Sequence, residues 1–231
     1  MKAALLVVGF LLQSGVAEAA PPAVCPVPGK VGDCVIFSFD WDKAAVPKYT
    51  IVVEEDRIVH YWEGDGPYDE VQRAKPSLTV SDAMFRKIFA VVEPGTLHDC
   101  ESKTRNIAQT GKKSVQWYDG DQYAECTFNY SDNARLNDIA ATFMAIAQTI
   151  QVGDRLKHSL RYDRLGLDAE MDSLVEAVQA GRALEVQNIA PVLQALIDDD
   201  RVMERVKRKA AHLLEGAGIS VQNYTPEPSA R

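Results

Sequence analysis

Strand-like patterning ends well before the end of this chain of 231 residues. Up to Tyr130, runs rich in β-branched and aromatic residues alternate with turn residues, which is typical of β-hairpins. From Asp154 onward, apolar residues recur only at the three- and four-residue spacing of amphipathic helices. The pattern therefore restricts the chain to folds in which a sheet-containing part is followed by a helical part.

The first half of the sheet-containing part has the order strand, strand, helix. Residues 34–39, 49–53 and 57–62 are rich in strand formers, and a short polar turn joins the last two of these segments into a hairpin. Apolar residues at helical spacing follow Ser81, a residue type that caps helix N-termini, until Pro94 ends the pattern. We therefore expect a hairpin followed by a short amphipathic helix.

The second half repeats this order. Residues 114–118 and 123–130 flank a turn that contains Gly120, and they predict a second hairpin. The helix that follows has one apolar face and is expected to end near Gly153. We expect residues 34–153 to form an α+β module, in which two strand–strand–helix units make an antiparallel sheet with helices on one face.

The C-terminal part, residues 154–218, is expected to be an all-α helical module. Helical spacing is clearest in residues 168–178, 186–197 and 200–214. The last residues, 219–231, contain Ser, Pro and Asn and are expected to form a disordered tail.

The N-terminus has the pattern of an export signal. Lys2 precedes an apolar stretch at residues 3–12, and Ala17 and Ala19 are the small residues that a signal peptidase requires. This stretch is shorter than the roughly 20 residues of a membrane-spanning helix. We expect residues 1–19 to be a signal peptide, and the mature chain to be periplasmic or secreted with no transmembrane segment.

An even number of cysteines follows the predicted cleavage site: Cys25, Cys34, Cys100 and Cys126. In an exported chain this predicts two disulfides, for which three pairings are possible. We favour Cys25–Cys34 and Cys100–Cys126, because each closes a local loop. The first would fix residues 20–33 as an irregular lead-in. The spacing argues against zinc, since no short paired spacing of the C-x-x-C kind occurs.

The formal net charge of −8 opposes binding to polyanions, so nucleic acid is not an expected partner. No glycine-flanked serine elbow and no glycine-rich phosphate loop occurs, and no two of the four histidines stand three or four residues apart. The sequence therefore predicts no catalytic residue, no metal ligand and no cofactor, and it leans away from an enzyme.

Aromatic residues cluster in both hairpins, with Tyr61 and Trp62 in the first and Trp117 and Tyr118 in the second. Alternation along a strand directs about half of these rings away from the core. If Trp62 and Trp117, or Tyr61 and Tyr118, share an exposed face, they form a platform for a sugar ring or a partner protein. The alternative, to which we give more weight, is that these rings cover the core.

Two segments resemble known families. Residues 49–150, with two hairpins each followed by a helix, resemble a bacterial exported domain of unknown function, which implies a fold and no activity. The final helical pair, residues 188–214, resembles a HEAT-type helical hairpin, whose aspartate–valine and basic–alanine–leucine pattern is matched by Asp200, Val202, Arg208, Ala210, Ala211 and Leu214.

The function expected from the sequence is therefore that of an exported, non-enzymatic binding module whose partner is another envelope or secreted protein. The alternative is a cell-envelope glycan-binding protein or glycan hydrolase. In that case Trp62 and Trp117 would be the platform, and Glu63 or Asp119 the catalytic acid or base.

Overall fold

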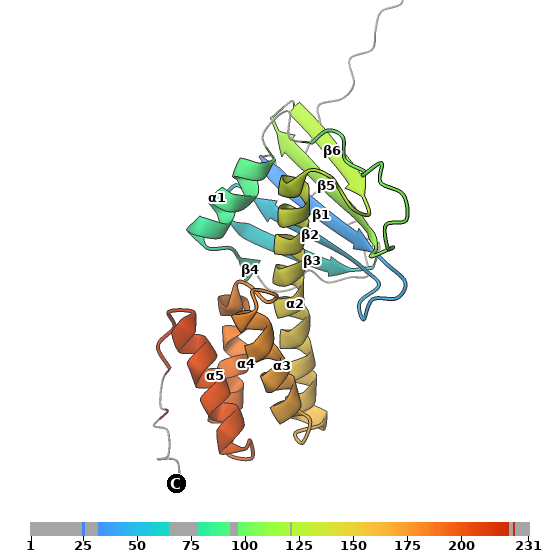
Figure 1. The fold of residues 1–231 in the computed structure, drawn as a ribbon. Coiled ribbons are helices and arrows are strands. Elements are labelled where there is room, and N and C mark those ends of the chain that lie inside the picture. Colours follow the sequence, from blue (N-terminus) through green and yellow to red (C-terminus); the bar gives the residue numbers. More distant parts are fainter. Residues whose placement is uncertain are drawn as a thin grey trace, which may run out of the picture.

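The computed structural model describes residue 25, residues 32–64, 78–92, 97–120 and 122–221, and residue 224. The predicted signal peptide, the helix stop at Pro94, most of the lead-in and most of the tail lie outside these residues. Figure 1 shows two parts, a sheet with helices across one face and a group of helices beyond the edge of that sheet.

The sheet has six strands, all antiparallel, in the order β4-β3-β2-β1-β5-β6. Their bounds are β1 Cys34–Asp40, β2 Lys48–Glu54, β3 Ile58–Glu63, β4 Leu78–Thr79, β5 Lys112–Asp119 and β6 Gln122–Phe128. The α+β class and the two hairpins, β2–β3 and β5–β6, are confirmed. The hairpins do not pair with each other, because β1 lies between them and pairs with both β2 and β5.

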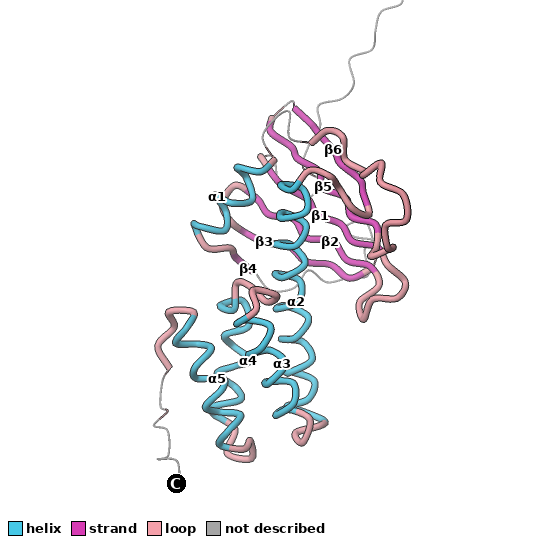
Figure 2. The backbone as a smooth tube through the Cα atoms, viewed as in Figure 1, coloured by secondary structure: helices cyan, strands magenta, loops and turns pink. Residues whose placement is uncertain are grey.

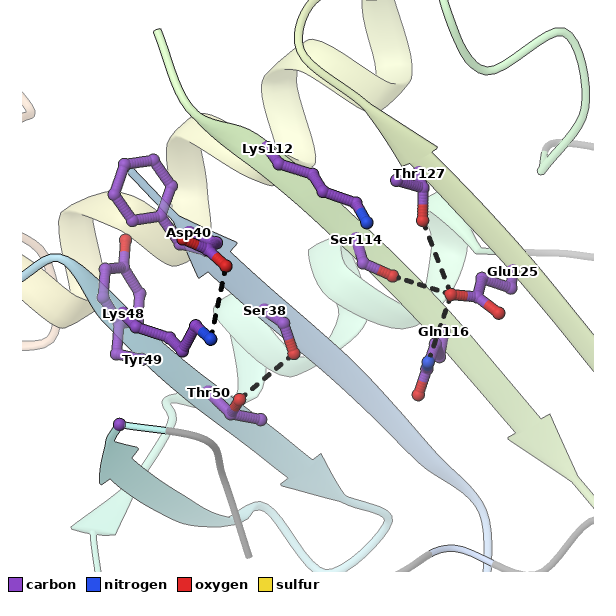
Figure 3. Close-up of a pocket in the computed structure, with 12 residues that line it drawn as sticks. Ser38, Asp40, Lys48, Tyr49, Thr50, Lys112, Ser114, Gln116, Glu125 and Thr127 are labelled. Carbon is purple, nitrogen blue, oxygen red and sulfur yellow. Dashed lines mark hydrogen bonds and ion pairs between the residues drawn. The ribbon is translucent and has the colours of Figure 1, made fainter. Parts of the chain in front are cut away.

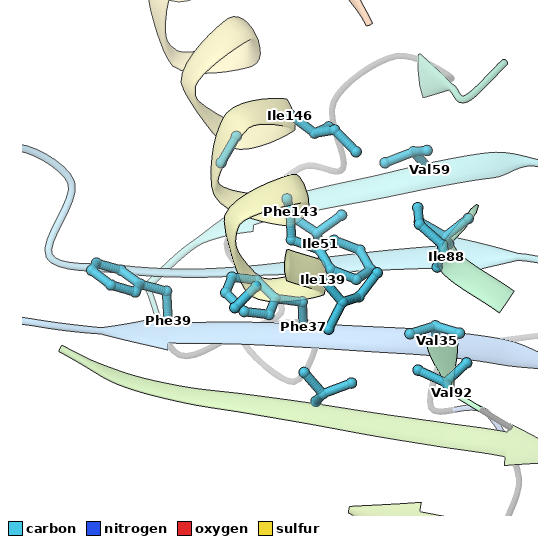
Figure 4. Packing of buried hydrophobic residues seen from close by; sticks show 14 of the residues in the cluster. Val35, Phe37, Phe39, Ile51, Val59, Ile88, Val92, Ile139, Phe143 and Ile146 are labelled. Carbon is cyan, nitrogen blue, oxygen red and sulfur yellow. The ribbon is translucent and has the colours of Figure 1, made fainter. Parts of the chain in front are cut away.

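Helices α1 (Asp82–Val91) and α2 (Ala134–Tyr162) cover one face of the sheet. Alternation along β1 sends Val35, Phe37 and Phe39 to this face, where they are buried. Phe143 of α2 stacks on Phe37, with ring centroids 5.1 Å apart (Figure 4). The main core therefore lies between the sheet and these two helices.

The helical part contains α3 (Leu167–Gln179), a short 3₁₀ helix η1 (Val186–Ile189), α4 (Ala190–Asp198) and α5 (Glu204–Gly216). Its buried residues form a second apolar cluster that starts at Val152 and ends at Leu214. The cluster under the sheet ends at Ile150. The C-terminal part is thus helical, as expected, and it has a core of its own.

The prediction that the helix after the second hairpin ends near Gly153 is wrong. Helix α2 runs for 29 residues, so its N-terminal half lies against the sheet and its C-terminal half lies in the helical part (Figure 2). A Cβ atom at Gly153 would lie only 2.4 Å from Cγ2 of Ile189 in η1. Gly153 is a poor helix former in isolation, but here it allows η1 to approach the helix closely.

Polar contacts also join the two parts. The Glu185 carboxylate accepts hydrogen bonds from the Ser81 backbone N–H (2.7 Å) and the Ser81 hydroxyl (2.9 Å). The Asn188 side chain bonds the backbone N–H and C=O of Thr79, each at 2.9 Å. Edge strand β4 and the N-terminus of α1 are therefore fixed to η1.

Both favoured disulfides are present, Cys25–Cys34 and Cys100–Cys126. The second ties the loop before β5 to the edge strand β6. Among the described helices, none combines the length and the apolar character needed to cross a membrane.

Gly153→Ala should destabilise the protein, because the new methyl group meets the buried, β-branched Ile189. Overpacking of this kind costs about 1–3 kcal/mol and outweighs the gain in helix propensity of up to about 1 kcal/mol. Gly216→Ala is the matched control, since a Cβ atom there meets nothing within 4 Å. Urea unfolding measures both variants. Equal midpoints for the two would contradict a close approach of α2 and η1.

Candidate functional site

The face of the sheet opposite α1 and α2 is the candidate site, and we call it the open face. No helix covers it in the described part of the chain. One end of the open face is apolar, with a small cluster formed by Cys25, Cys34, Ile36, Val52 and Trp62. The other end is a polar groove of about 290 Å³, shown in Figure 3.

A row of four hydroxyl groups crosses this groove. Register pairs place Thr50 beside Ser38, Ser38 beside Ser114, and Ser114 beside Thr127, so the row spans β2, β1, β5 and β6. Neighbouring strands lie about 4.8 Å apart, so the four residues extend over about 14 Å. The Ser38 and Thr50 hydroxyls are hydrogen-bonded at 3.1 Å. Hydroxyls both donate and accept, so the row offers both kinds of contact to a ligand.

A carboxylate with four donors lies beside the hydroxyl row. Glu125 Oε1 accepts from Ser114 (3.0 Å), Gln116 (3.2 Å) and Thr127 (3.5 Å), while its Oε2 accepts from the Tyr123 hydroxyl at 2.6 Å. The Tyr123 hydrogen bond is the largest cause that lowers the pKa of Glu125, and the other three donors add to it against the opposing effect of desolvation. Glu125 is therefore ionised at neutral pH and held in one orientation.

Charged side chains line the opposite end of the groove. Lys48 forms an ion pair with Asp40 at 3.4 Å. Lys112 stands on the other side of Asp40 in the register, and its ammonium group extends toward the hydroxyl row in Figure 3. Charges and hydroxyls thus follow one another along the strands.

Tyr123 adds an exposed aromatic surface next to the carboxylate. The residue is 45% exposed, and its ring centroid lies 4.9 Å from that of Tyr118, its register partner on β5. Burial and the bond to Glu125 raise the pKa of Tyr123, so the hydroxyl remains a donor. The ring face is available for stacking while the hydroxyl is engaged.

The four aromatic residues predicted as a platform lie on two faces of the sheet. Tyr61 and Trp117 belong to the core under the helices and are 1% and 6% exposed. Trp62 and Tyr118 are on the open face, where Trp62 is 6% exposed and stacks with His60. Neither expected pair, Trp62 with Trp117 or Tyr61 with Tyr118, shares a face. Tyr118 contributes to the candidate site through its contact with Tyr123.

The predicted acid–base pair is too far apart for hydrolysis. Glu63 is on β3 and Asp119 on β5, three strand spacings or about 14 Å away. Strand pairing also puts Glu63 level with Lys113 near the start of β5. Asp119 lies six residues beyond Lys113, which adds about 20 Å along the strand. Glycosidase carboxyl groups are about 5–9.5 Å apart, so these two residues do not form such a pair.

Sequence reasoning missed the polar groove, although a signal for it exists. Every second residue of β5 from Lys112 to Gln116 is polar, as is every second residue of β6 from Tyr123 to Thr127, which indicates a solvated face. The order of the strands in the sheet places these residues next to the polar residues of β1 and β2 that line the groove. Within the described residues, no cluster of three or more His, Cys, Asp or Glu side chains has the arrangement of a metal site.

No protein-family model matches this chain, and searches of curated proteins and of solved structures found no significant match. The geometry of the open face is therefore the ground for assigning a function to this chain.

Glu125→Gln should change how stability depends on pH. A folded-state pKa below the ordinary value means that ionised Glu125 stabilises the fold above about pH 4.5, and that this contribution is lost as the pH falls through the lowered pKa. The variant should be less stable at pH 7 by up to about 1 kcal/mol after solvent screening, and should approach the parent protein as the pH falls through the lowered pKa of Glu125.

Urea midpoints between pH 7 and pH 3 test this. Glu215→Gln, at an exposed position of α5, is the control and should follow the parent protein throughout. A constant difference between Glu125→Gln and the parent across the whole range would contradict the assignment.

Proposed function

We propose that this protein is an exported, non-catalytic binding protein that holds a glycan on the open face of its sheet. The observation that carries the proposal is the hydroxyl row, next to which Glu125 accepts hydrogen bonds from Ser114 and Thr127 and, through its other oxygen, from the hydroxyl of the exposed Tyr123. Two disulfides support export, because such bonds persist in oxidising compartments. The predicted signal peptide supports the same compartment.

A glycan fits the chemistry of this face better than a peptide. Sugar hydroxyls donate and accept hydrogen bonds, as do Ser38, Ser114 and Thr127 in the groove. Tyr123 offers a flat apolar surface of the kind that stacks on a sugar ring. A peptide would need apolar pockets for its side chains, whereas the strand residues facing this groove are mainly hydroxyl, amide and charged groups.

Binding without hydrolysis fits the state of Glu125. A glycosidase acid needs a raised pKa so that it carries a proton at neutral pH. The four donors around Glu125 lower its pKa instead, so the group serves as a fixed hydrogen-bond acceptor. A protein partner on the helical part, the function that the sequence favours, takes second place because the apolar residues of α4 and α5 pack into their own core.

The test is to titrate the oxidised mature chain, starting at Ala20, against a panel of neutral and acidic oligosaccharides by calorimetry. Tyr123→Ala should weaken binding about tenfold, the loss typical of an exposed aromatic anchor. Tyr130→Ala is the matched control, because Tyr130 is 48% exposed and follows the end of β6, whereas Tyr123 donates a hydrogen bond to the groove residue Glu125. It should bind like the parent protein.

Equal affinity of the parent and Tyr123→Ala would contradict the assignment of this face. Release of reducing ends from a bound oligosaccharide would show catalysis and would contradict the non-catalytic part of the proposal. Loss of binding in both tyrosine variants would indicate a structural effect and count against the groove.

A further inference from the structure

The charged side chains of the groove differ in whether they have an ion-pair or hydrogen-bond partner within the protein. The Asp40 carboxylate is paired with Lys48 at 3.4 Å. Glu125 accepts four hydrogen bonds from neutral donors. Lys112 is exposed, and in the described residues it has no ion-pair or hydrogen-bond partner. Among the described residues, the ammonium group of Lys112 therefore has no acceptor.

The position of Lys112 makes this ammonium available to a ligand. Asp40 is its register partner on β1, but the carboxylate of Asp40 is engaged with Lys48 on the far side. In Figure 3, Nζ of Lys112 extends along β5 toward Ser114 and the hydroxyl row. An anionic group at this point would meet the three N–H donors of the Lys112 ammonium group and a neighbouring hydroxyl, all within one groove.

The charged and neutral groups of the groove follow one another in a fixed order along the strands. Lys112 and Gln116 are four residues apart on β5, and Glu125 is the register partner of Gln116. The backbone positions of these two charged ends are thus about 13 Å apart along the strands, and Nζ of Lys112, which extends toward Ser114, lies nearer to Glu125 than that. A ligand with one acidic group beside Lys112 and neutral hydroxyls on the side of Glu125 would match this order of charges.

We propose that the groove selects glycans that carry an acidic sugar, such as a uronate, and that Lys112 binds the acidic group. This inference rests on the proposed glycan-binding function and names its ligand class. The net charge of −8 adds a general repulsion of highly charged polymers, so recognition is expected for short acidic oligosaccharides in which Lys112 makes a local contact.

The experiment compares a galacto-oligosaccharide that carries a single galacturonate at one end with the fully neutral galacto-oligosaccharide of the same length, using the full mature chain and calorimetry at low and moderate salt. The parent protein should bind the acidic oligomer about fivefold more tightly, a factor equivalent to the roughly 1 kcal/mol upper range of exposed ion pairs. Lys112→Gln should remove this preference, so that the acidic and neutral oligomers bind the variant with equal affinity. Lys112→Arg should retain most of the preference.

Lys43→Gln is the matched control. Lys43 is an exposed lysine in the turn between β1 and β2 and is not part of the groove lining. It should preserve the preference and also report any effect of net charge alone. Thermal unfolding of each variant checks that the sheet is intact.

The outcomes separate the two proposals. Equal affinity of the parent protein for both oligomers, or equal losses in Lys112→Gln and Lys43→Gln, would overturn the role of Lys112 while glycan binding stands. Binding of neither oligomer, nor of any other glycan tested, would overturn the proposed function itself.

Discussion

The close packing of α2 against η1 at Gly153 is the contact on which the arrangement of the molecule depends. One half of α2 closes the core under the sheet, and the other half belongs to the helical core. Because an α-helix is continuous and hydrogen-bonded along its length, the two cores are held by one rigid element. Glu185 and Asn188 add polar contacts on either side of this junction.

The choice of residues that each strand buries on the covered face determines which residues lie on the open face. Phe37, Phe143 and their neighbours bury the apolar side chains of each strand on the side of α1 and α2. Alternation then leaves the intervening residues on the other side, where no helix replaces water in the described structure. In β5 and β6 these residues are polar, so the same register that builds the core also assembles the groove.

Preorganisation is the main property of the groove. Glu125 is fixed by donors from β5 and β6, both rigid strands joined by a short hairpin. Such a network holds hydrogen-bonding groups in place before a ligand arrives and so reduces the ordering cost of binding. The hydroxyl row spans four strands, so these groups are distributed across the width of the open face.

The sequence by itself determined the local features: the α+β class, the two hairpins, the helical character after Asp154, and both disulfide pairs among three possible pairings. These depend on residue spacing over short distances. Tertiary structure alone decided that α2 continues through Gly153, that Trp62 and Trp117 point to opposite faces, and that Ser38 and Thr127 share one row. Each of these depends on which distant segments become neighbours, and local propensity carries no information about that choice.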